Sequence, residues 1–87
     1  QISSDVVGPI CESGDYFCKN RMLPKIGEGD YLALLSAGAY GFVMASNYNT
    51  RTFPAEVLVK GNRAEVVRSR QKVKQLWASE SVPKWLK

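Results

Sequence analysis

The sequence contains no histidine, and this absence removes several classes of catalytic and metal site. Without an imidazole there is no histidine-based catalytic triad and no histidine ligand for zinc. The two cysteines, Cys11 and Cys18, do not make a zinc site on their own. Gly38 and Gly41 form neither of the common glycine-rich phosphate-binding fingerprints. Together these absences argue against a self-contained nucleotide-dependent enzyme.

Long apolar runs and secretion signals are also lacking. No run approaches the roughly 18 residues of a membrane-spanning helix, and no charged-then-apolar leader precedes a small-residue cleavage site. A small secreted domain would carry a denser disulfide framework than two cysteines allow. The sequence therefore predicts a protein of the reducing cytoplasm with no membrane partner.

Positive charge exceeds negative charge by four, but it does not form one block. We therefore expect a solvated surface and no nucleic-acid partner. The alternative is a small β-rich module that binds RNA or a protein through its basic residues. Much of the surplus lies at Lys60, Arg63, Arg68, Arg70, Lys72 and Lys74.

The length of 87 residues and the apolar content of 45% predict a single domain, residues 1–87, with one core. A domain this small buries little surface, so its stability should be marginal unless a partner covers one of its faces. The chain also begins at Gln1 and enters a predicted strand almost at once. We therefore expect it to be a piece of a longer protein.

The chain reads as mainly β. The β-branched residues of Ser4–Cys11 predict a strand, and the apolar run Tyr31–Leu35 predicts a second, buried strand. The most definite local pattern is a hairpin, in which two β-rich segments, 55–59 and 64–68, flank a turn at Gly61-Asn62.

Two helices are also predicted. One or two helical turns are expected near residues 39–47. Val73, Leu76 and Trp77 stand at helical spacing, which predicts an amphipathic helix near residues 70–79.

Groups capable of chemistry gather at the end of the first predicted strand, in Cys11-Glu12-Ser13-Gly14-Asp15. A thiol that is protonated at neutral pH can donate a proton, and a carboxylate attracts an ammonium group. The same composition is also typical of a small buried cysteine followed by solvated turn residues. The residues alone leave both interpretations open.

Three segments in order resemble the diaminopimelate decarboxylases and span nearly the whole chain. They are Val6–Asp15, then Ser36–Phe42 with Ser46–Asn49, and finally Pro54–Val59. The resemblance implies a carboxy-terminal β-barrel or sandwich-like domain of the alanine racemase-like, fold-type III decarboxylases. An amino-terminal α/β barrel, absent here, would carry pyridoxal 5'-phosphate on a lysine that no lysine of this chain matches. The fragment alone is therefore expected to be inactive.

The resemblance also implies an activity and roles for three residues. The whole enzyme would convert meso-2,6-diaminopimelate to L-lysine and carbon dioxide, as a homodimer in lysine biosynthesis. Cys11 would donate a proton to Cα across the dimer interface, and Glu12 would bind the distal amino group of the substrate. Tyr40 would contact the cofactor phosphate or the substrate. Its alternative role is that of an aromatic residue packed beside Phe42.

Related decarboxylases act on ornithine, arginine or carboxynorspermidine, and these substrates are the alternatives within the fold. The setting of Glu12 in Cys-Glu-Ser-Gly-Asp resembles the diaminopimelate branch. The implied partners are the barrel of the same chain, a second subunit and the small-molecule substrate.

Overall fold

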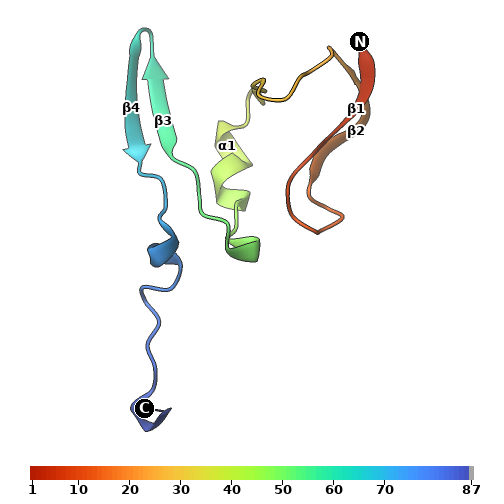
Figure 1. Cartoon of the computed structure of the whole chain (residues 1–87). Coiled ribbons are helices and arrows are strands. Elements are labelled where there is room, and N and C mark those ends of the chain that lie inside the picture. The colour runs from red at the N-terminus through yellow and green to blue at the C-terminus, as the bar shows by residue number, and fades with distance from the viewer. Residues whose placement is uncertain (87) are drawn as a thin grey trace. The chain divides into compact units, whose positions relative to one another are not determined.

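The computed structural model describes residues 1–86, which form two compact units. The first unit is Gln1–Ala39, and the second begins at Tyr40. Each contains one two-stranded antiparallel sheet (Figure 1). The mainly β fold expected from the sequence is confirmed, whereas the single domain remains a prediction.

The sheet of the first unit pairs β1 (Ile2–Val7) with β2 (Tyr16–Leu23). Its register shifts twice, between Ser4 and Val6 and again between Val6 and Val7. At the first shift the carboxylate of Asp5 accepts a hydrogen bond of 2.7 Å from the backbone N–H of Asn20, which has a φ of 53°. Irregular pairing of this kind bends a strand and increases its twist.

β1 ends at Val7, earlier than predicted. The chain then turns back into β2, a strand that was not predicted from the sequence. The predicted buried strand Tyr31–Leu35 is wrong. This segment has no strand structure, and Tyr31 is 99% exposed. Residues 32–35 instead line an open groove of about 430 Å³ together with side chains of β1 and β2, among them Phe17.

The second β-sheet is the hairpin predicted from the sequence. β3 (Glu56–Lys60) pairs with β4 (Arg63–Arg68), and Lys60 faces Arg63 across the turn. Of the two turn residues, Gly61 has a positive φ of 60° and Asn62 does not. This matches a type II′ turn, in which glycine takes the first central position.

The helical elements are short. α1 (Gly38–Gly41) continues into the 3-10 helix η1 (Phe42–Met44), which confirms the turns predicted near residues 39–47. A second 3-10 helix, η2, covers Tyr48–Thr50. The helix predicted near residues 70–79 is reduced to the 3-10 turn η3 (Val73–Leu76), and another turn, η4, covers Lys84–Leu86.

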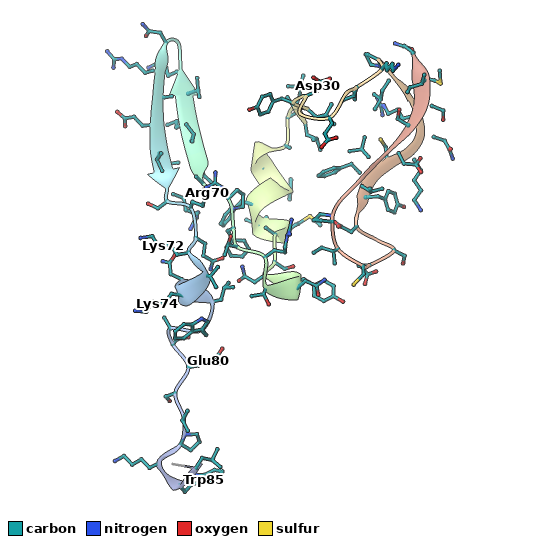
Figure 2. The ribbon with its side chains drawn as sticks, in the orientation of Figure 1. Asp30, Arg70, Lys72, Lys74, Glu80 and Trp85 are labelled. Carbon is teal, nitrogen blue, oxygen red and sulfur yellow. The ribbon has the colours of Figure 1, made fainter. Side chains whose placement is uncertain are left out.

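The reduction of the C-terminal helix has a physical cause. An amphipathic helix gains most of its stability from packing its apolar face. Here Val73 is 60% exposed and Trp77 is 54% exposed, so that face has no cover. The basic residues Arg70, Lys72 and Lys74 lie along the same stretch, labelled in Figure 2.

No residue of the described chain, polar or apolar, is buried. The single core expected from length and composition is therefore wrong for residues 1–86. Large apolar side chains of both sheets are exposed, including Val57, Val59 and Val66 on β3 and β4. Isolated two-stranded sheets are at best marginally stable in water, so both sheets lack the cover that a stable domain needs. None of the helices in residues 1–86 has the length and apolar character needed to span a membrane.

Candidate functional site

The loop between β1 and β2, residues 8–15, carries two of the three predicted site residues, and we call it the site loop. Its base is closed by a backbone hydrogen bond of 2.8 Å from the N–H of Gly8 to the carbonyl of Asp15. Its tip is a tight turn, in which the N–H of Asp15 donates to the carbonyl of Glu12 at 3.0 Å. The loop therefore has a defined backbone although it is largely exposed.

The side chain of Asp15 holds the site loop from within. Its Oδ2 accepts a hydrogen bond of 2.9 Å from the backbone N–H of Ile10. The carboxylate fills the space beside Gly8 in which a Cβ would lie. Only glycine at position 8 leaves room for this arrangement. These contacts are those of a turn residue, which is one of the two interpretations that the sequence left open for this segment.

Cys11 and Glu12 are consecutive residues near the tip of the site loop, and both are exposed. Oε1 of Glu12 accepts a hydrogen bond of 3.2 Å from the backbone N–H of Gly14. This bond orients the carboxylate but leaves it open to solvent. The structure thus places a thiol and a carboxylate next to each other on the site loop, and neither group is buried.

Tyr40, the third predicted site residue, is the first residue of the second unit. The residue is 79% exposed, so the structure does not support the alternative of a packed aromatic. Its backbone has a φ of 74°, in the left-handed region that non-glycine residues rarely adopt. Strained residues of this kind cluster at functional sites.

The second unit also contains a cluster of side chains that the sequence did not predict. The rings of Phe42 and Phe53 lie 5.2 Å apart between centroids. The guanidinium of Arg68 lies over the Phe42 ring at 4.3 Å, and its Nε donates to Oε2 of Glu56 at 3.0 Å. We call these four residues, with Gln71, the aromatic cluster.

Gln71 connects this cluster to the loop that precedes β3. Its Oε1 accepts hydrogen bonds from Nδ2 of Asn47 at 2.8 Å and from the backbone N–H of Phe53 at 3.0 Å. Its own N–H donates to the carbonyl of Phe53 at 3.1 Å. The partners lie 18 to 24 residues away in sequence, so no local pattern could have revealed these contacts.

Comparison with known proteins gives a consistent result. Residues 1–38, nearly the whole first unit, match the family described as pyridoxal-dependent decarboxylase, C-terminal sheet domain. The chain is 59% identical over 78 residues to the diaminopimelate decarboxylase of Pseudomonas aeruginosa, covering 90% of this chain and 19% of that protein. It is 52% identical over 79 residues to the enzyme of Methanothermobacter thermautotrophicus, covering 91% and 18%.

Solved structures agree. The crystal structure of diaminopimelate decarboxylase from M. jannaschii in co-complex with L-lysine has a TM-score of 0.89 and 38% identity, over 100% of this chain and 20% of that chain. The enzyme from Helicobacter pylori complexed with L-lysine has a TM-score of 0.84 and 42% identity, over 91% and 20%.

Residues 1–38 thus match a C-terminal sheet domain of pyridoxal-dependent decarboxylases. The chain as a whole is similar in sequence and fold to part of the diaminopimelate decarboxylases, which confirms the resemblance predicted from the sequence. It spans about a fifth of the length of these relatives.

Proposed function

We propose that the chain is the carboxy-terminal part of a decarboxylase that converts meso-2,6-diaminopimelate to L-lysine and carbon dioxide. The observation that carries the proposal is the exposed pair Cys11 and Glu12, held at the tip of a stiffened loop. The names of the relatives support the same reaction. Within residues 1–86 neither group is buried, and the proposal therefore includes a surface of the longer enzyme that covers them.

Pyridoxal phosphate is the cofactor that the family description implies. When bound, it supplies an electron sink for the negative charge left at Cα as carbon dioxide departs. The donor set of this chain fits a contributing role: the Tyr40 hydroxyl is exposed and can donate a hydrogen bond to a phosphate oxygen or to the substrate. The lysine that anchors the cofactor belongs to another part of the enzyme.

Cys11 is the proposed proton donor. Decarboxylation replaces a carboxylate on Cα with a proton, and the protein must deliver that proton to one face of the carbon. The thiol of Cys11 is exposed on the site loop, where it can reach into a pocket that another surface forms.

Glu12 is the proposed selector of the substrate. Its carboxylate is open to solvent and accepts a hydrogen bond of 3.2 Å at Oε1 from the backbone N–H of Gly14, and a carboxylate has further acceptor capacity for an ammonium group. In a covered site, a substrate without a distal ammonium would leave this charge unpaired, which carries a large energetic penalty.

The site loop projects these two groups outward, so the proposal includes a surface that receives them. We propose that this surface belongs to the barrel of a second subunit in a homodimer. The exposed state of the loop and the absence of burial in residues 1–86 support a missing partner of this kind.

The proton-donor role is tested in the longer enzyme with Cys11→Ala, and Cys18→Ala is the matched control. We expect Cys11→Ala to lower kcat about 100-fold and to scramble the configuration of deuterium incorporated at Cα in D₂O. Cys18 lies on β2, outside the site loop, and its replacement should change kcat by less than about twofold. Wild-type kcat and wild-type stereochemistry in Cys11→Ala would end the assignment.

A substrate panel separates diaminopimelate from the related basic amino acids. The proposal expects turnover of meso-diaminopimelate far above that of ornithine, arginine or carboxynorspermidine. Preferred turnover of any of these three would place the enzyme in another branch of the fold.

A further inference from the structure

Tyr40 adopts a backbone conformation that it would not hold unaided. A non-glycine residue in the left-handed region carries a steric penalty, and it persists only where the surrounding structure imposes it. With a φ of 74° and 79% of its surface exposed, Tyr40 receives little support from its own packing. The backbone conformation of Tyr40 must therefore be held by the residues next to it in the sequence.

Phe42, two residues further on, is the first anchored side chain after Tyr40. Its ring is held between the ring of Phe53 at 5.2 Å and the guanidinium of Arg68 at 4.3 Å. Arg68 is in turn fixed by its 3.0 Å ion pair with Glu56 across the hairpin. The start of η1, which follows directly after the helix α1 that contains Tyr40, is thereby tied to β3 and β4.

Gln71 holds Phe53, the second ring of the Phe42–Phe53 pair. It bonds both backbone polar groups of Phe53, accepting from the N–H at 3.0 Å and donating to the carbonyl at 3.1 Å. The same Oε1 accepts from Asn47 at 2.8 Å, at the start of a segment in which Asn49 and Thr50 also have positive φ angles. Oε1 of Gln71 thus holds Asn47 near the start and Phe53 near the end of the segment between η1 and β3.

We propose that Gln71 is a positioning residue for Tyr40, acting through Phe53 and Phe42 to hold the Tyr40 hydroxyl where the reaction requires it. This inference rests on the proposed function, because it takes Tyr40 to contact the substrate or the cofactor phosphate. Misplacement of a contacting group by about 1 Å can lower a rate by up to 100-fold, so a remote residue can control it.

Two substitutions of Gln71 separate loss of its hydrogen bonds from a change of side chain. Both side-chain bonds of Gln71 use Oε1 as an acceptor, and a glutamate presents an acceptor oxygen at the same position. Gln71→Glu therefore preserves both bonds, whereas Gln71→Leu removes both at similar size. Gln75→Leu is the matched control, because Oε1 of Gln75 accepts the N–H of Lys72 at 2.7 Å, a local contact at the start of η3.

The experiment measures kcat/KM for meso-diaminopimelate in the longer enzyme. Gln71→Leu should lower it about tenfold, with Gln71→Glu and Gln75→Leu within about twofold of wild type. In a Tyr40→Phe background, Gln71→Leu should have no further effect beyond about twofold, because the group it positions is gone. Hydrogen exchange of the Phe53 amide should accelerate about tenfold in Gln71→Leu and stay slow in Gln71→Glu.

Two results would overturn the positioning role while the proposed function stands: wild-type kcat/KM in Gln71→Leu although Tyr40→Phe is impaired, or an equal loss from Gln71→Leu with and without the Tyr40 hydroxyl. A failure of the proposed function looks different, since the unmodified longer enzyme would then release no carbon dioxide from meso-diaminopimelate.

Discussion

The carboxylate of Asp15 occupies the space beside the Cα of Gly8 in which any other residue would place its Cβ. From there it accepts the N–H of Ile10, and the Asp15 carbonyl accepts the N–H of Gly8. Two residues seven positions apart therefore shape the loop that presents Cys11 and Glu12. The lack of a side chain at Gly8 is as important for this loop as the charge at Asp15.

The first prediction concerns Gly8→Ala. The new methyl group must displace the Asp15 carboxylate, which breaks the bond to Ile10 at a cost of about 1–3 kcal/mol. We expect kcat in the longer enzyme to fall about tenfold, because the site loop is no longer held. Gly14→Ala is the control from the same loop, since its Cβ would meet only Oε1 of Glu12 at an ordinary 3.7 Å.

A double variant shows whether the two residues act together. In an Asp15→Ala background there is no carboxylate to displace, so Gly8→Ala should add less than about 0.5 kcal/mol to the loss. Fully additive effects of the two substitutions would show that the overlap with Asp15 is not the cause.

The second prediction concerns the hairpin turn. Gly61 has a φ of 60°, which an alanine adopts at a cost of about 1–2 kcal/mol. Gly61→Ala should lower the free energy of unfolding of the longer enzyme by that amount in a urea titration. Asn62→Ala, at the neighbouring turn position without positive φ, should change it by less than about 0.5 kcal/mol. Equal effects at the two positions would contradict the turn geometry.

The third prediction concerns the 87-residue chain alone. Because none of residues 1–86 is buried, the isolated chain should bind a hydrophobic dye and self-associate as its concentration rises. Sedimentation and dye fluorescence measure both effects. A strict monomer at high concentration that does not enhance the dye would show that the exposed apolar side chains need no cover.

The hairpin Glu56–Arg68 could be predicted from sequence because its information is local. Two β-branched segments and a glycine that supplies positive φ specify strand, turn and register within 13 consecutive residues. The helical turns near residues 39–47 were also predictable from local sequence.

Elements that depend on distant packing were not predictable. Tyr31–Leu35 has the composition of a buried strand, but within residues 1–86 it pairs with neither β1 nor β2; it stays irregular, and its residues 32–35 line an open groove. The apolar positions near Trp77 have helical spacing but nothing to pack against, so only the η3 turn forms. In both cases the apolar residues would form the predicted element only if another surface packed against them.

The candidate site divides in the same way. The resemblance identified Cys11, Glu12 and Tyr40, and the strand end located the first two on an exposed loop. The overlap of Asp15 with Gly8 and the hold of Gln71 on Phe53 depend on three-dimensional placement, which spacing does not encode.

The most direct measurement compares two substrates of the longer enzyme, meso-diaminopimelate and 2-aminopimelate, which lacks the distal amino group. If Glu12 pairs with that amino group, Glu12→Gln lowers kcat/KM for diaminopimelate about 10- to 100-fold and leaves 2-aminopimelate within about twofold, with Glu28→Gln as a control outside the site loop. An equal loss on both substrates, or no loss on either, would contradict the claim that the site loop completes a decarboxylase site in which Glu12 binds the distal ammonium group of the substrate.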